Sequence, residues 1–75
     1  PAPTVLEVTD GVMTKTDNFA FVQPYIGLET IAESGTVIAY DGDEAITTPY
    51  DDCVLVMPNH RAGRGQRVLR LARRV

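Results

Sequence analysis

Apolar residues in the first half of the chain occur in short runs that alternate with polar residues and end at turn residues. Residues 4–9 alternate in this way, as a strand with one buried face does. Asp10-Gly11 follows as a turn signal, and residues 14–18 form a polar loop. A second apolar run covers residues 19–22 and is ended by Pro24, which a central strand does not tolerate. The pattern predicts strands at residues 4–9 and 19–22.

The middle of the chain predicts three further strands. Residues 36–40 and 45–48 are rich in residue types that favour strands, and the tight turn Asp41-Gly42-Asp43 joins them. Residues 53–57 are five consecutive apolar residues, the pattern of a fully buried strand. Residues 27–33 are bounded by glycines and are expected to form a loop with room for one helical turn.

The last segment, residues 67–73, fits two structures. As a helix it would place four apolar residues on one face: Val68, Leu71, Ala72 and Val75. As a strand it would alternate, with Leu69 and Leu71 on one face. We favour the strand because only ten residues follow Gly65, and short isolated helices are marginal. The chain is then a single all-β domain (residues 1–75), a small barrel or sandwich of six or seven short strands, like a barrel-sandwich hybrid.

Charge is distributed very unevenly along the 75 residues. Residues 1–60 hold all ten acidic residues and one base, Lys15, for a net charge of -9. Residues 61–75 hold six arginines and no acid, for a net charge of +6. No aromatic residue follows Tyr50 to stack on bases, and the acidic body repels a polyanion, so we expect no nucleic-acid partner. The arginines are expected to pair with the acidic body or with a neighbouring acidic domain, or to stay solvated.

The sequence predicts a cytoplasmic location and no membrane partner. No apolar run approaches the roughly 20 residues that a transmembrane helix needs, and no signal-peptide pattern is visible. Cys53 is the single cysteine and cannot form an internal disulfide, which fits a reducing compartment. The chain opens with Pro1 instead of methionine, so we expect it to be a piece of a longer protein.

The chain offers little chemistry of its own. Cys53 and His60 are the only soft or borderline metal ligands, and two ligands do not make a tetrahedral site. We therefore expect no metal site, a buried thiol and an exposed loop histidine. No serine stands in a G-x-S-x-G elbow, and no catalytic residue is expected. Lys15 lacks the adjacent methionines of a biotin or lipoate carrier and is expected to be a solvated loop lysine.

Four segments carry a resemblance to a known family: GTVIAYDG at residues 35–42, ITTPYD at residues 46–51, VLVMPN at residues 54–59 and GQRVLRLAR at residues 65–73. In order and spacing they resemble the C-terminal β-domain of the succinylglutamate desuccinylase/aspartoacylase family. The resemblance covers residues 35–73, and more loosely residues 19–24.

This resemblance implies that the chain is the C-terminal domain of a zinc-dependent hydrolase that cleaves the amide bond of an N-acyl amino acid. In the family, two histidines and a glutamate of an N-terminal catalytic domain hold zinc, and another glutamate acts as general base. The single histidine of this chain cannot supply that zinc site. The implied partners are an upstream catalytic domain of the same polypeptide and a small anionic substrate such as N-succinylglutamate or N-acetylaspartate.

The loop that follows the VLVMPN segment is the candidate site. The resemblance implies that this β-domain narrows the mouth of the active site, where cationic groups attract and clamp carboxylates. Arg61 is the first candidate to face the substrate entrance, and Asn59 and His60 are the next. Some relatives carry a tyrosine and a lysine in this loop, and this sequence has neither. The alternatives are an ordinary exposed loop, or an independent binding module that uses the arginines or Lys15.

Overall fold

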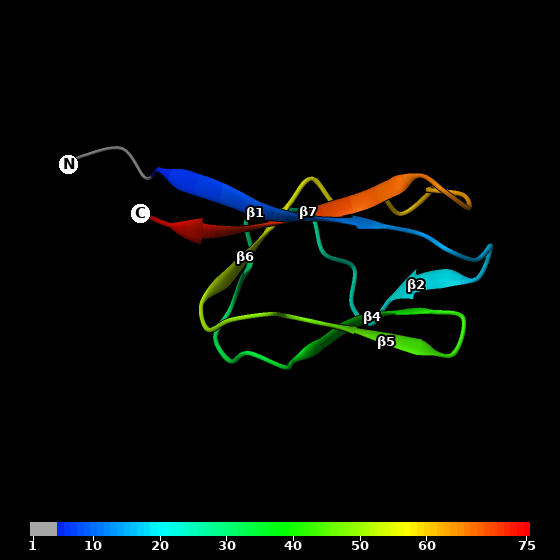
Figure 1. Ribbon diagram of the computed structural model, residues 1–75, viewed down its shortest axis with the longest axis horizontal. Coiled ribbons are helices and arrows are strands. Elements are labelled where there is room, and N and C mark those ends of the chain that lie inside the picture. Colours follow the sequence, from blue (N-terminus) through cyan, green and yellow to red (C-terminus); the bar gives the residue numbers. More distant parts are fainter. Residues whose placement is uncertain (1–4) are drawn as a thin grey trace.

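The computed structural model describes residues 5–75 of the chain. These residues form seven strands, arranged in two antiparallel sheets and connected by loops (Figure 1). One sheet has the strand order β1-β7-β6-β3 and the other the order β2-β4-β5. In chain order the strands are β1 (Leu6–Met13), β2 (Phe19–Phe21), β3 (Thr30–Ile31), β4 (Val37–Asp41), β5 (Glu44–Thr47), β6 (Cys53–Val56) and β7 (Arg67–Arg74).

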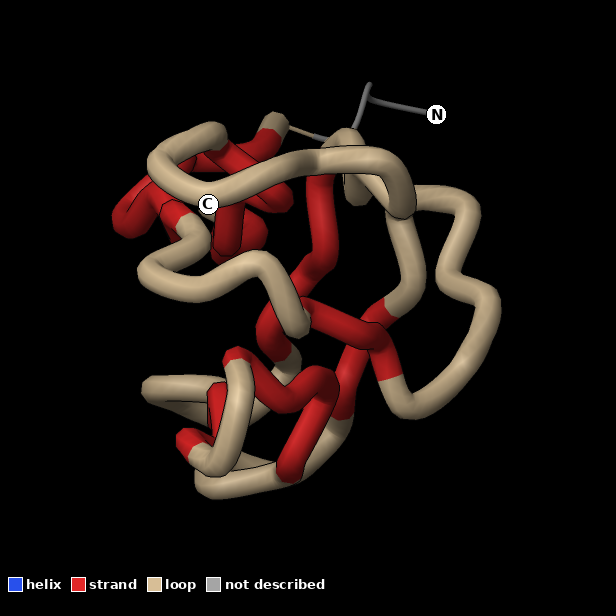
Figure 2. Tube along the Cα trace, turned by 90° about the vertical axis from the view of Figure 1, so that its right-hand side faces the viewer, coloured by secondary structure: helices blue, strands red, loops and turns tan. Residues whose placement is uncertain are grey.

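The prediction of a small all-β domain is confirmed. Figure 2 shows strands joined by loops, and no helix is present among the described residues. Residues 5–75 therefore contain no helix that could cross a membrane. Of the two predicted forms, the sandwich is the one observed, because the two sheets remain separate and do not close into a barrel. Figure 1 shows β1 and β7 on one side of the molecule and β4 and β5 on the other.

The core lies between the sheets and is built mainly from buried residues of the central strands β4, β6 and β7. Leu55 of β6 is fully buried and lies opposite Leu71 of β7 in the register. Ile38 of β4 is also fully buried and belongs to the other sheet. Residues 53–56 therefore form the buried strand predicted from the apolar run, and the predicted last residue of that run, Met57, lies outside it and is 72% exposed.

The first strand is longer than predicted. The sequence predicts a turn at Asp10-Gly11, but β1 continues to Met13. The predicted turn is wrong because β7 offers a partner along its whole length, so that Asp10 pairs with Leu71 and Gly11 with Arg70. The polar residues are instead accommodated by an irregularity between Val8 and Asp10. Thr4, the predicted first residue of this strand, lies outside the described residues.

The segment predicted as a loop at residues 27–33 contains a short strand. Thr30 and Ile31 of β3 pair with Val54 and Cys53 of β6 and complete the four-stranded sheet. Such a short strand has no visible alternation of its own, and β6 provides its hydrogen-bonding partner.

The final segment is a strand, as favoured, and it lies in the middle of its sheet between β1 and β6. Its register contains one extra residue. Val12 pairs with Leu69 and Met13 with Arg67, so Val68 has no partner on β1. This bulge explains why Val68 and Leu69, although consecutive, are both buried.

The β4–β5 hairpin is as predicted. Gly42 and Asp43 form its turn, between the paired residues Asp41 and Glu44. Gly42 has φ of 61°, a conformation that glycine adopts without steric cost. Its absent side chain also leaves room for Thr16, whose methyl carbon lies 3.4 Å from where a Cβ would stand. The hairpin tip therefore packs against the loop between β1 and β2.

The two ends of the described chain meet at one end of the β1–β7 pair. Leu6 pairs with Arg74, and the amide of Val75 donates a hydrogen bond of 3.1 Å to the carbonyl of Val5. Figure 1 shows β1 beginning where β7 ends.

Candidate functional site

The candidate loop connects β6 to β7 and is held in place at its first turn. Met57 has φ of 53°, a left-handed conformation that turns the chain sharply away from β6. Two residues later, the amide of Asn59 donates a hydrogen bond of 2.7 Å to the carbonyl of Val68 in β7. The start of the loop is therefore fixed beside β7.

Asn59 and Arg61 are joined through the backbone of the loop. The side-chain oxygen Oδ1 of Asn59 accepts a hydrogen bond of 3.0 Å from the amide of Arg61. This bond closes a local turn of the kind that asparagine favours. It also orients the Asn59 amide group, because with Oδ1 engaged the Nδ2 group remains as a donor for other partners. The Arg61 side chain is exposed and makes no ion pair with a carboxylate of residues 5–75.

His60 points to a different part of the molecule. Its Nε2 lies 2.6 Å from the carbonyl oxygen of Tyr25, and since a carbonyl only accepts, Nε2 is the protonated nitrogen. The imidazole ring packs against Phe21 at a centroid distance of 4.8 Å, and Phe21 contacts Tyr25 edge to face at 6.0 Å. His60 therefore connects the candidate loop to the segment after β2 and is not free to turn toward a ligand.

Part of the basic C-terminal region pairs with the acidic body, as one of the alternatives predicted. Arg64 contacts Asp17 at 3.0 Å, and Arg73 contacts Glu7 at 2.6 Å. Lys15 lies 3.6 Å from Glu44 in the loop that the sequence predicts. These pairs are well exposed, so each contributes at most about 1 kcal/mol.

A hollow of about 210 Å³ lies beside the candidate loop, and the sequence pattern does not predict it. It is lined by Met57, Asn59, Arg67, Leu69 and Arg70. In a regular strand, residues three apart lie on opposite faces, so the sequence alone separates Arg67 from Arg70. The bulge at Val68, which depends on the pairing with β1, brings the two arginines together. Of the three predicted site residues, only Asn59 lines this hollow.

The segment between β2 and β3 borders the same end of the molecule and exposes large apolar side chains. The exposed fractions are 90% for Ile26 and 67% for Leu28, and Met57 in the candidate loop is 72% exposed. Glu29 holds this segment, because its carboxylate accepts hydrogen bonds of 2.7 Å from the amides of Ile26 and Gly27. These backbone bonds, that of Ile26 first, lower the pKa of Glu29 below its ordinary value.

The residues of this chain do not fit a zinc site. Cys53 is fully buried in the core, whereas His60 is bonded to the carbonyl of Tyr25. Within residues 5–75, no group of three or more histidine, cysteine, aspartate or glutamate side chains is arranged to hold a metal ion. No step of a zinc-dependent reaction is therefore assigned to this chain.

The Cys53 thiol is expected to be unreactive in the folded protein. Burial, and then the charge of Asp10, raise its pKa above the ordinary value, so the reactive thiolate is scarce. Iodoacetamide should alkylate it several thousandfold more slowly than in the urea-unfolded chain if opening costs about 5 kcal/mol. Mass spectrometry of timed samples measures both rates. Equal rates in the two states would contradict the buried position.

Comparison with known proteins identifies no relative of the chain. No protein-family model matches the sequence, and no curated protein or solved structure gives a significant match. The function is therefore inferred from the residues and their arrangement.

Proposed function

We propose that the chain is a non-catalytic β-domain of a zinc-dependent deacylase in the cytoplasm. In this proposal it follows a catalytic domain in the same polypeptide and shapes the access of N-acyl amino acids to the active site. N-succinylglutamate and N-acetylaspartate represent the substrate class. The resemblance of residues 35–73 to the C-terminal domain of the succinylglutamate desuccinylase/aspartoacylase family motivates the proposal.

One observation carries it: the residue types that make up the resemblance occupy positions where the backbone needs them. The segment at residues 35–42 contains β4 and its hairpin turn, and Gly42 takes the positive φ that the turn requires. The segment at residues 54–59 contains the end of β6 and the turn after it, where Asn59 bonds back to Arg61. Motifs that serve the fold in this way support a shared architecture more strongly than a chance similarity of composition would.

The charge of the candidate loop and the following strand also supports the proposal. All six arginines of the chain lie in residues 61–75, and two of them, Arg64 and Arg73, form ion pairs within the described residues. A surface that keeps unpaired guanidinium groups raises the local concentration of anions. Substrates with two or three carboxylates would be drawn to such a surface.

The reading frame that encodes Pro1 tests the domain proposal. We expect it to encode, upstream, two histidines and a glutamate at zinc-ligand spacing, and the full protein to release acyl groups from N-succinylglutamate or N-acetylaspartate. The isolated 75-residue chain with zinc should show no turnover above buffer. Robust hydrolysis by the isolated chain, or an upstream frame without these ligands, would overturn the proposal. In the second case the chain would be an independent binding module.

A further inference from the structure

The bulge in β7 places two arginines on the same outer face of the four-stranded sheet. Arg70 pairs with Gly11 of β1 and Val56 of β6. Its neighbours along β7, Leu69 and Leu71, face inward and belong to the core. Because Val68 is the extra residue and is buried in the core, Arg67 pairs with Met13 and shares the outward side with Arg70.

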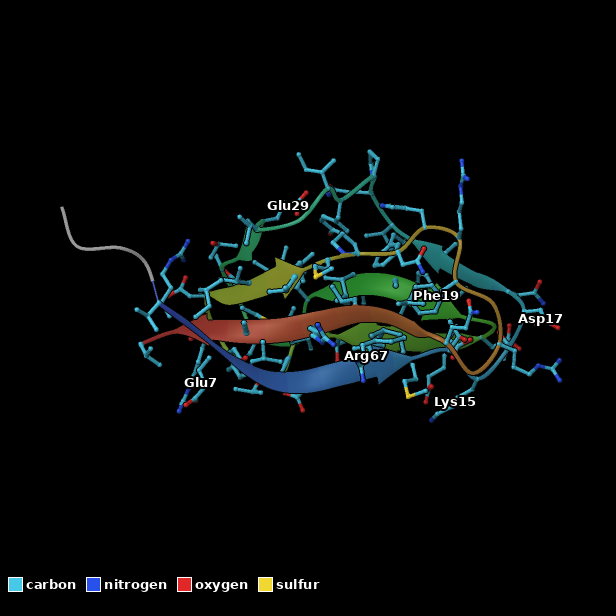
Figure 3. All side chains as sticks on the ribbon, turned by 90° about the horizontal axis from the view of Figure 1, so that it is seen from above. Glu7, Lys15, Asp17, Phe19, Glu29 and Arg67 are labelled. Carbon is cyan, nitrogen blue, oxygen red and sulfur yellow. The ribbon has the colours of Figure 1, made fainter. Side chains whose placement is uncertain are left out.

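Gly11 provides the space in which Arg67 lies. The Nε atom of Arg67 is 3.5 Å from where a Cβ of Gly11 would stand, so the guanidinium stem crosses β1 at its one residue without a side chain. Figure 3 views the molecule from the side of β1 and β7 and shows Arg67 over these two strands. Arg70 projects from the same face and is partly buried. The stems of the two arginines thus border the hollow of about 210 Å³ described above.

The side chains that line this hollow include N–H donors and no carboxylate. Arg67 and Arg70 carry only N–H donors, and Asn59 presents its Nδ2 group because Oδ1 is engaged by the amide of Arg61. Neither Arg67 nor Arg70 forms an ion pair with a carboxylate among residues 5–75. The larger hollow near the chain ends, of about 460 Å³, is different because Asp51 and Asp52 line it together with two arginines.

We propose that the hollow bounded by Asn59, Arg67 and Arg70 binds a small organic carboxylate. Two guanidinium groups and an amide N–H match the lone pairs of a carboxylate, and arginine binds this group in a bidentate manner. Met57, which is 72% exposed, belongs to the lining and offers apolar contact to an aliphatic carbon chain. The inference goes beyond the proposed function, because the hollow lies on this chain alone and its occupancy requires no catalytic domain.

Titration of the full chain with glutarate, followed by ¹H–¹⁵N NMR, tests the inference. We expect saturable shifts in the Asn59 side-chain amide and in the Arg67 and Arg70 Nε–H signals, with a Kd on the order of 1 mM. The neutral analogue glutaramide should cause no such shifts, and inorganic phosphate should bind more weakly than glutarate because it gains nothing from the apolar lining. Absence of glutarate shifts, equal binding of glutaramide, or tighter binding of phosphate would each overturn the inference.

Substitutions separate a built site from general attraction to positive charge. Arg67→Gln and Arg70→Gln should each weaken glutarate binding about tenfold, since each removes a charge-assisted contact. Arg74→Gln removes the same unit of charge at the far end of β7, outside the hollow, and should change the affinity less than twofold. An equal loss for Arg74→Gln would indicate nonspecific attraction and contradict the site.

Asn59→Asp provides a test that does not depend on the arginine variants folding. The aspartate keeps an oxygen to accept from the amide of Arg61 but replaces the Nδ2 donor with a negative charge. Glutarate binding should fall by at least about tenfold while the dispersion of the NMR spectrum is unchanged. A folded Asn59→Asp variant that binds glutarate as well as the parent would overturn the inference. Competition with a single-stranded oligonucleotide is a further test. If the oligonucleotide displaced glutarate at concentrations below the Kd of glutarate, the surface would be assigned to a polyanion and the inference would be overturned.

Discussion

Replacing Leu55 by alanine is expected to lower the free energy of unfolding by about 3 kcal/mol. Leu55 is fully buried at the centre of β6 and lies opposite Leu71 of β7. Truncation removes apolar contacts and leaves a cavity between two sheets that can relax only in part. A domain of this size has only about 5–15 kcal/mol of stability in total, so the change is a large fraction of it. Urea unfolding followed by circular dichroism measures the difference.

Met57→Ala is the matched control for Leu55→Ala. It removes a side chain of similar size two residues later, but that side chain is 72% exposed. Its substitution should change the free energy of unfolding by no more than about 0.5 kcal/mol. If both variants lost the same stability, β6 would not carry the core as described.

Replacing Asp41 by asparagine is expected to lower the melting temperature at neutral pH by several degrees and to loosen the loop between β1 and β2. The carboxylate of Asp41 is buried at the end of β4. It accepts hydrogen bonds from the Thr16 hydroxyl at 2.6 Å, the Lys15 amide at 2.7 Å and the Thr16 amide at 3.1 Å. An asparagine of the same shape would bring an NH₂ group toward these donors. Thermal unfolding and hydrogen exchange of the Lys15 and Thr16 amides measure the two effects.

The pH dependence of stability gives the same prediction a second readout. The hydrogen bond from the Thr16 hydroxyl, followed by that from the Lys15 amide, lowers the pKa of Asp41 in the folded protein. A lowered pKa means that the stabilisation is complete above the unfolded-state value of about 4 and is lost as the pH falls through the folded-state value. The difference in melting temperature between parent and Asp41→Asn should therefore shrink below about pH 4.

Asp43→Asn is the matched control for the hairpin. Asp43 lies two residues from Asp41, in the turn itself, and its side chain is exposed. This variant should unfold as the parent does between pH 3 and pH 7, within roughly 0.5 kcal/mol. A pH-independent difference between parent and Asp41→Asn would show that the carboxylate charge does not hold the loop.

The sequence was sufficient to predict those parts of the fold that depend on local pattern. The run at residues 53–57 and the Gly42 turn are visible in neighbouring residues, and the structure has β6 and the β4–β5 hairpin there. The extension of β1 past Gly11 and the short strand β3 were not predicted. Both exist because a partner strand, β7 or β6, offers hydrogen bonds to a segment with no strong preference of its own.

The candidate site shows the same division between local and non-local information. The resemblance groups Asn59, His60 and Arg61 in one loop, yet His60 bonds to Tyr25 and does not line the hollow. Arg67 belongs to the hollow only because Val68 is an extra residue in the pairing with β1. The register of β7 against β1 is set by contacts between residues more than 50 positions apart, such as Val12 and Leu69. No short window of the sequence therefore contains this information.

The meeting of the two chain ends has a mechanical consequence. Leu6 and Arg74 are paired at one end of the β1–β7 ladder, and the hydrogen bond from Val75 to Val5 lies beyond them. In an antiparallel pair the hydrogen bonds run across the strands, so a pull on both ends loads the terminal bond first and then each next bond in turn. Tension between the attachments at the two ends would therefore unzip β1 from β7 step by step, with little resistance. The outer face that carries Arg67 and Arg70 would be lost before the hairpin of β4 and β5 bore any load.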